Sequence, residues 1–191
     1  MLPNQKVAKD PYVENTGTND ALVFLKVTAP KANIIVAAND GTRGQAALQE
    51  IFSYQRGNED EGFQDGFNTD AFMQIAKEDS DSTVSYVFAY NNALPAGQET
   101  TALFDHVQLK NVIEGQVDAT TQNIDVKAYA IQATDILDAS GDDITDGTLD
   151  EATLKSIYDV YVKQNDGIAE DTADSNGDKN LKGETLAQPQ P

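Results

Sequence analysis

The sequence of 191 residues contains no cysteine, no tryptophan and a single histidine. The absence of cysteine excludes disulfide bonds, thiolate metal sites and cysteine nucleophiles. With His106 alone, a zinc site of the His-Glu-x-x-His type is excluded, and a Ser–His–Asp triad has one candidate base. Phosphate-binding loops are also missing, because Gly41 to Gly44 lacks the Lys-Ser/Thr pair of a P-loop. We therefore predict that the protein is not an enzyme and has no catalytic residues.

Long apolar runs are missing as well. No stretch approaches the roughly 18 residues that span a bilayer, so we expect no membrane insertion of the mature chain. The first residues, Met-Leu-Pro-Asn-Gln, have no apolar core of a signal peptide. If the protein is exported, we expect its signal peptide to be absent from this sequence.

Positive charge is scarce, with 13 Lys and Arg against 32 Asp and Glu, which gives a net charge of −19. Such an excess repels the phosphates of nucleic acids and anionic lipids, so we expect neither as a partner. The charge is compatible with divalent-cation binding, although a solvated acidic surface explains it more simply.

One segment has the oxygen-ligand spacing of a calcium loop. Asp174, Asn176, Asp178 and Asn180 occupy positions 1, 3, 5 and 7 of that pattern. The segment departs from the pattern where a calcium loop has its glycine and its final bidentate glutamate. We retain calcium at these four residues as the only candidate cofactor.

Apolar residues alternate with polar ones in several segments rich in β-branched and aromatic residues, which predicts strands. These segments are residues 6–14, 21–28, 32–38, 71–78, 83–90, 106–112 and 124–133. The polar residues 79–82 are predicted to close a hairpin, and alternation places His106 on the strand face opposite Val107 and Leu109. Seven short strands favour an all-β fold, a jelly-roll-like antiparallel β-sandwich.

Two short peripheral helices are predicted, at about residues 43–54 and 149–163. Each begins with a threonine that is followed three residues later by Gln or Glu, the spacing of a capping box. Helical spacing places Leu48, Ile51 and Phe52 on one face of the first helix. It places Leu154, Ile157, Tyr158 and Tyr161 on one face of the second. We expect both faces to pack on the sandwich.

The chain divides by composition into two parts. Residues 1–136 are predicted to form the β-sandwich domain, with the first helix inserted and an exposed, acidic, mobile loop at residues 57–68. Residues 137–191 are predicted to form an acidic C-terminal extension with the second helix. Its tail, residues 168–191, is nearly free of apolar residues and is expected to be disordered.

Several segments together resemble the TasA/camelysin family of secreted Gram-positive matrix proteins. They are Lys9-Asp-Pro-Tyr-Val-Glu-Asn-Thr-Gly17, Asn19-Asp-Ala-Leu-Val-Phe-Leu-Lys-Val27, Leu94-Pro-Ala-Gly-Gln-Glu-Thr-Thr101, Leu103-Phe-Asp-His-Val-Gln-Leu-Lys-Asn111 and Ala128-Tyr-Ala-Ile-Gln-Ala133. The resemblance covers roughly residues 6–136 and implies an exported jelly roll that polymerises into extracellular fibres. Camelysin is classed as a metallopeptidase, but the present sequence has no zinc-ligand cluster, so that activity is not carried over.

In such fibres an N-terminal strand of one subunit is expected to complete a sheet of the next. Val7, Tyr12 and Val13 are therefore predicted to lie at the subunit interface. The function predicted from the resemblance is a structural subunit of biofilm-matrix or cell-surface fibres, secreted to the extracellular matrix or cell surface. Its partners are further copies of itself, with other matrix proteins as additional candidates. The alternatives are a monomeric surface adhesin or binding module that uses residues 57–68, and a secreted zinc hydrolase that depends on His106.

Overall fold

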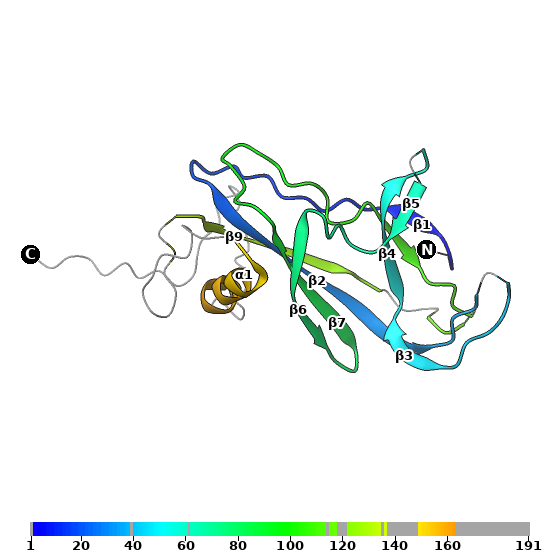
Figure 1. Ribbon diagram of the computed structural model, residues 1–191. Coiled ribbons are helices and arrows are strands. Elements are labelled where there is room, and N and C mark those ends of the chain that lie inside the picture. The colour runs from blue at the N-terminus through cyan, green and yellow to red at the C-terminus, as the bar shows by residue number, and fades with distance from the viewer. Residues whose placement is uncertain are drawn as a thin grey trace, which may run out of the picture.

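A computed structural model describes residues 2–38, 40–60, 62–113, 115–117, 122–134, 136 and 149–162. The described chain is an all-β structure in which two antiparallel sheets face each other, with one helical segment on the outer side of the larger sheet (Figure 1). The predicted all-β class is confirmed. No helix in these ranges is long and apolar enough to cross a bilayer.

The smaller sheet contains four strands. Their spatial order is β1 (Lys6–Ala8), β8 (His106–Leu109), β4 (Phe52–Asn58) and β5 (Gly62–Asp65). β4 and β5 form a hairpin, but β8 pairs with strands distant in the chain: Val107 on β8 pairs with Val7 on β1 and with Tyr54 on β4. The β1–β8 ladder joins segments that are about a hundred residues apart.

The larger sheet is built around β2 (Ala21–Ile34). On one side β2 pairs with β7 (Thr83–Tyr90), which pairs with β6 (Phe72–Asp79) in a hairpin. On the other side its first part pairs with β9 (Asp125–Gln132) and its last part with β3 (Ala47–Glu50). The predicted hairpin at residues 71–90 and the strong alternation at residues 124–133 are thus confirmed as elements of one sheet.

Proline at position 30 suits the place where the two partners of β2 meet. Thr28 pairs with the first residue of β9 and Lys31 pairs with the last residue of β3, so Pro30 lies between the two ladders. Proline has no N–H group and is tolerated where a strand has no ladder to donate to. Its carbonyl oxygen still accepts a hydrogen bond of 3.3 Å from Ile51 N.

Alternation along β2 gives the larger sheet two apolar faces. Leu25 and Val27 point into the main core, which lies between the sheets and is completed by residues of both sheets. Leu22 and Phe24 point to the opposite face, where the helical segment covers them. Strand β2 is therefore buried on both sides, which explains its unbroken apolar run.

The helical segment consists of α1 (Glu151–Ile157) followed by a π-helical turn, η1 (Tyr158–Val162). Leu154, Ile157 and Tyr158 are buried against the larger sheet, as the helical spacing predicted. The predicted capping residue, Thr148, lies outside the described residues. Asp150 is the N-cap, because its side chain accepts a hydrogen bond of 2.8 Å from Thr153 N.

The helix predicted at residues 43–54 is wrong, because this segment forms β3 and the beginning of β4. Ile51 and Phe52 are buried as expected, but Leu48 is 45% exposed. The capping spacing of Thr42 and Gln45 is a local signal, whereas β3 is held by pairing with the distant end of β2. Non-local pairing overrides a helix signal of this strength.

The segment at residues 57–68 is also not simply a loop. Its first residues end β4, and residues 62–65 form β5, so the two strands close a hairpin. The predicted tail at residues 168–191, with the calcium candidates Asp174, Asn176, Asp178 and Asn180, lies outside the described residues. The side chain of Tyr161 is likewise not described.

Candidate functional site

The outer edge of β9 is an incomplete edge of the larger sheet. Hydrogen bonds from Lys31 N to Ser82 O, and from Ile51 N to Pro30 O, show that odd residues of β2 bond towards β7 and even residues towards β9 and β3. In the register of β9, residues 125, 127, 129 and 131 then bond to β2. The backbone N–H and C=O groups of Val126, Ala128 and Ala130 point outward and have no hydrogen-bond partner in the described part of the chain.

The side chains of the same three residues lie on the face of β9 that continues the main core. Val126 pairs with Val27 and Ala128 with Leu25, and paired residues share a face of the sheet. Val27 and Leu25 are buried in the core, but Val126 is 38% exposed and Ala128 is also exposed. The smaller sheet ends at β1 and does not cover this part of β9.

A groove of about 590 Å³ opens between β1 and the beginning of β9. Its apolar floor consists of Phe52, Phe104 and Val107, which belong to the main core. Its walls are the N-terminal segment and the chain that enters β9, lined by Val7, Lys9, Asp10, Pro11, Gln122, Asn123, Ile124, Asp125 and Val126. The groove therefore exposes part of the main core next to the outer edge of β9, whose backbone groups are unpaired in the described part of the chain.

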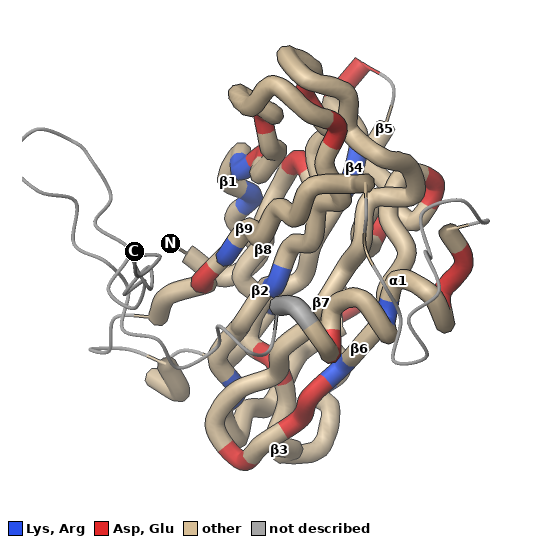
Figure 2. The backbone as a smooth tube through the Cα atoms, turned by 90° about the vertical axis from the view of Figure 1, so that its left-hand side faces the viewer, with Lys and Arg blue, Asp and Glu red and all other residues tan. Residues whose placement is uncertain are grey.

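Figure 2 faces this side of the molecule, with β1, β8 and β9 in view. Positive residues lie on and just after β1, and a negative residue begins β9, so charges of both signs border the groove.

The predicted interface residues lie in the N-terminal segment and have different environments. Val7 is half-buried, pairs with Val107 and lines the groove. Val13 packs against the main core, and its N–H donates to Thr100 Oγ1 at 3.0 Å. Tyr12 is 54% exposed. In the single subunit the N-terminal segment is therefore bound to its own chain. Of the three predicted interface residues, only Tyr12 is exposed.

Backbone hydrogen bonds continue this attachment beyond β1. Lys9 N donates to Asp105 O at 2.9 Å, Leu103 N to Pro11 O at 3.0 Å, and Asn15 N to Gln98 O at 2.9 Å. The predicted strand at residues 6–14 is therefore regular only at residues 6–8. Its remainder is an extended segment that follows residues 97–105.

A second, polar cavity of about 340 Å³ lies beside the β4–β5 hairpin. Arg56 lines it and donates hydrogen bonds to Gln64 at 2.9 Å and to Asp70 at 2.8 Å. The Nε atom of Arg56 is buried and has no hydrogen-bond partner among the described residues. This cavity presents one guanidinium group among neutral and acidic neighbours.

His106 lies on the outer face of β8, opposite the buried Val107 and Leu109, as alternation predicted. Its ring contacts Phe63 edge-on with 5.0 Å between ring centroids. Lys6 Nζ lies 3.5 Å from the centre of the same Phe63 ring. The described residues contain no cluster of three or more His, Asp or Glu side chains arranged to hold a metal ion.

A partly buried carboxylate lies among tyrosines of both sheets. Glu50 on β3 accepts a hydrogen bond of 2.9 Å from the Tyr86 hydroxyl on β7. Burial, and then the charge of Glu50, raises the pKa of Tyr86 and of Tyr54 on β4 well above the usual value for tyrosine. Burial also lowers the pKa of Lys110, although the attraction of Glu50 opposes this effect.

Comparison of the chain with protein-family models, with curated proteins and with solved structures found no match. The functional argument therefore depends on the chain's own geometry. Sequence reasoning predicted an interface segment at the N-terminus but did not identify which strand has an open edge. The small residues Ala128 and Ala130 at alternate positions of a strand were the available signal, because they leave room for a neighbouring chain.

Proposed function

We propose that the protein is a structural subunit of extracellular biofilm-matrix or cell-surface fibres and that it polymerises by adding a strand from one subunit to a sheet of the next. The observation that carries this proposal is the unpaired outer edge of β9 beside an open groove of about 590 Å³. An exposed edge is a template for another strand, and most proteins cover or charge such an edge. We further propose that the two sheets form a jelly roll, which the pairing of β1 with β8 and of β2 with β7 supports.

The side chains of the incoming strand would alternate between apolar residues that enter the groove and residues that stay at the surface. Its backbone would bond to the outward groups of Val126, Ala128 and Ala130, which provides affinity without sequence preference. Every second side chain would point into the groove towards Phe52 and Phe104, so these positions would be apolar. The side chains between them would remain at the surface.

The donor in this proposal is the N-terminal segment with Val7, Tyr12 and Val13. In the single subunit, β1 pairs with β8 over only three residues, Lys6–Ala8. A ladder this short is inexpensive to open, and the released segment would exchange its bonds with β8 for bonds to the β9 edge of the next subunit. The partners are accordingly other copies of this chain, with other matrix proteins as additional candidates, and the location is outside the cell.

The test is negative-stain electron microscopy of the mature protein, with Ala128→Pro as the key variant. Proline removes the outward N–H of an edge strand, which the fold tolerates but an added strand does not. Filaments of the wild type that disappear in Ala128→Pro and persist in Ala128→Ser support the proposal. The serine variant is the matched control, because it keeps the N–H group and a small side chain. Persistent monomers of the wild type in all buffers would contradict it.

The polar cavity beside the β4–β5 hairpin favours a second candidate, a monomeric surface adhesin or binding module. The partly exposed Arg56 guanidinium, whose buried Nε has no hydrogen-bond partner among the described residues, is suited to an acidic group on a matrix or host ligand that competes with Asp70. In that case Arg56→Gln would abolish binding to immobilised matrix and leave filament formation unchanged. Loss of both properties together would instead indicate damage to the fold.

A further inference from the structure

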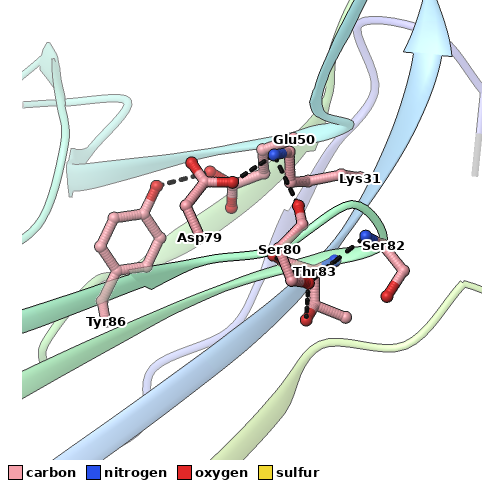
Figure 3. A network of polar contacts seen from close by, with 7 residues as sticks. All are labelled: Lys31, Glu50, Asp79, Ser80, Ser82, Thr83 and Tyr86. Carbon is pink, nitrogen blue, oxygen red and sulfur yellow. Dashed lines mark hydrogen bonds and ion pairs between the residues drawn. The ribbon is translucent and has the colours of Figure 1, made fainter.

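A lysine and an aspartate form an ion pair, with a glutamate beside it, where the β6–β7 hairpin reaches the last part of β2 (Figure 3). Lys31 Nζ contacts the Asp79 carboxylate at Oδ1 and donates a hydrogen bond of 2.8 Å to the Ser80 carbonyl oxygen. Its side chain is 11% exposed, less than any other cation in an ion pair of the described residues. Figure 3 shows the Glu50 carboxylate beside this contact.

The position of Glu50 is set by the sheet. Lys31 and Glu50 are directly opposite each other in the β2–β3 ladder, so their side chains leave the sheet on the same face. One oxygen of Glu50 accepts the hydrogen bond from Tyr86. The other oxygen, Oε1, is buried and has no hydrogen-bond partner among the described residues. A buried acceptor without a partner is costly, which makes it a sign of a role other than stability.

We propose that Lys31 and Asp79 join through an intramolecular amide bond between Nζ and Cγ, with Glu50 as the proton carrier. The Nζ–Cγ bond forms, one Cγ–O bond breaks, and the oxygen departs as water. An ammonium group and a carboxylate contain all the atoms of one amide and one water molecule. The reaction therefore needs no oxidant, no cofactor and no second substrate, and it leaves the net charge of the protein unchanged.

Each side chain has a defined part in this reaction. Glu50 takes a proton from Nζ, which frees the nitrogen lone pair for attack on Cγ. It delivers this proton to the departing oxygen, and after the attack it carries a second proton from the nitrogen to the same oxygen, which leaves as water. The Tyr86 hydroxyl holds Glu50 in place through its hydrogen bond of 2.9 Å. Asp79 is 53% exposed, which leaves a path for the released water.

The bond would connect strands that are not neighbours. Strand β7 lies between β2 and β6, so the amide would tie the hairpin turn to the strand beyond it. The chain has no cysteine, so no disulfide provides such a link. A covalent link of this kind holds a β-protein together under pull or heat by limiting the separation of its strands.

The deciding measurement is the intact mass of the full chain under denaturing conditions. The linked protein is lighter than its sequence mass by one water. Tryptic mapping should show no cleavage after Lys31 and should recover one branched peptide that contains Lys31 and Asp79. Cleavage after Lys31 together with the full sequence mass would overturn the proposal and leave an ordinary ion pair.

Three variants exclude other losses of water. Lys31→Arg should restore the full mass, whereas a cyclic imide at Asp79 would survive this change. Asp79→Asn should lose one ammonia instead of one water, because the same amide then forms from a carboxamide. Glu50→Gln should leave Lys31 and Asp79 unlinked in a protein whose circular dichroism is unchanged. If Glu50→Gln fails to fold, the wild-type peptide map still decides the question.

The chain offers an internal control. Lys155 and Asp159 form an ion pair of 2.6 Å on the helical segment, where Glu151 is one turn before the lysine and no strand pairs a glutamate with it. Their peptides should be cleaved after Lys155 and remain unbranched in the same digest. A branch at this pair as well would indicate nonspecific dehydration of the sample and would contradict a role for Glu50.

Discussion

Gly57 lies near the end of β4 with a φ of +85°, and a Cβ atom at this position would come within 2.4 Å of the Gly62 carbonyl oxygen. Gly62 has nearly the same backbone angle, +87°, but a Cβ atom there would meet no atom within 4 Å. Both positions are strained for any other residue, by roughly 1–2 kcal/mol. Only at position 57 would the added Cβ atom also collide with the backbone. Rotation of a side chain cannot relieve this collision, because the atom it meets is a backbone oxygen.

Gly57→Ala is therefore expected to lower the free energy of unfolding by about 1–2 kcal/mol more than Gly62→Ala does. Chemical denaturation of the two variants and the wild type measures this difference. Equal losses in the two variants would mean that the β4–β5 hairpin does not approach as closely as described.

Tyr54 and Tyr86 are expected to resist ionisation at alkaline pH. Burial and the Glu50 charge raise the pKa of both hydroxyls in the folded protein. They therefore contribute stability that is fully present below the unfolded tyrosine pKa of about 10 and is lost as pH rises above it. Tyrosinate absorbance at about pH 11 should report fewer ionised tyrosines in the folded than in the denatured protein.

The double variant Tyr54→Phe/Tyr86→Phe provides the comparison for this titration. It removes the two shifted groups, so the difference between folded and denatured absorbance should shrink. Phenylalanine also leaves Glu50 without the Tyr86 hydroxyl, so the folded variant should be less stable at neutral pH. A wild-type titration identical in the folded and denatured states would show that the two hydroxyls are not buried.

At the scale of elements, α1 is attached to the larger sheet by a few large side chains. Leu154 is 1% exposed and packs with Phe24 and Ile75, while Lys155, its neighbour, faces solvent. Leu154→Ala should cost about 2–5 kcal/mol of unfolding free energy, because it removes a buried side chain and leaves a cavity. Lys155→Ala should change stability by less than about 0.5 kcal/mol.

Hydrogen exchange of the β2 and β6 amides shows whether the loss of stability in Leu154→Ala spreads from α1 to the larger sheet. If α1 is part of the cooperative unit, Leu154→Ala should speed exchange throughout the larger sheet. Faster exchange confined to α1 would mean that the helix is an appendage whose loss the sheet tolerates.

Some of these elements could be predicted from the sequence and others could not. Apolar, β-branched and aromatic residues, with polar turn residues between the segments, predicted β2, β6, β7 and β9. The prediction failed at residues 43–54, where β3 is only four residues long and depends on the far end of β2. Local spacing cannot reveal a partner that lies some sixteen residues away in the chain.

The candidate site was predictable only in part. The resemblance directed attention to Val7 and Val13, but residue types alone do not say that β1 is already paired with β8. The open edge of β9 depends on what the smaller sheet fails to cover, which is a property of the assembled fold. The meeting of Lys31, Glu50 and Asp79 likewise requires the register of four strands.

At the scale of the whole molecule, assembly must overcome the repulsion between subunits with a net charge of −19 each. The groove border carries both signs of charge, so the local contact is permitted while the long-range force opposes approach. Filament growth should therefore respond to any condition that weakens long-range repulsion more than it weakens backbone pairing.

Raising the salt concentration from about 0.01 M to 0.15 M shortens the screening length from roughly 30 Å to 8 Å. Filament yield at neutral pH should rise over this range, because distant acidic groups then no longer repel the incoming subunit. Lowering the pH towards about 4.5 at low salt should have the same effect, since protonation of carboxylates begins there. Sedimentation followed by measurement of the pelleted protein gives the yield. Ala128→Pro should remain in the supernatant under every condition, whereas sedimentation of this variant would show that screening causes aggregation instead of strand addition.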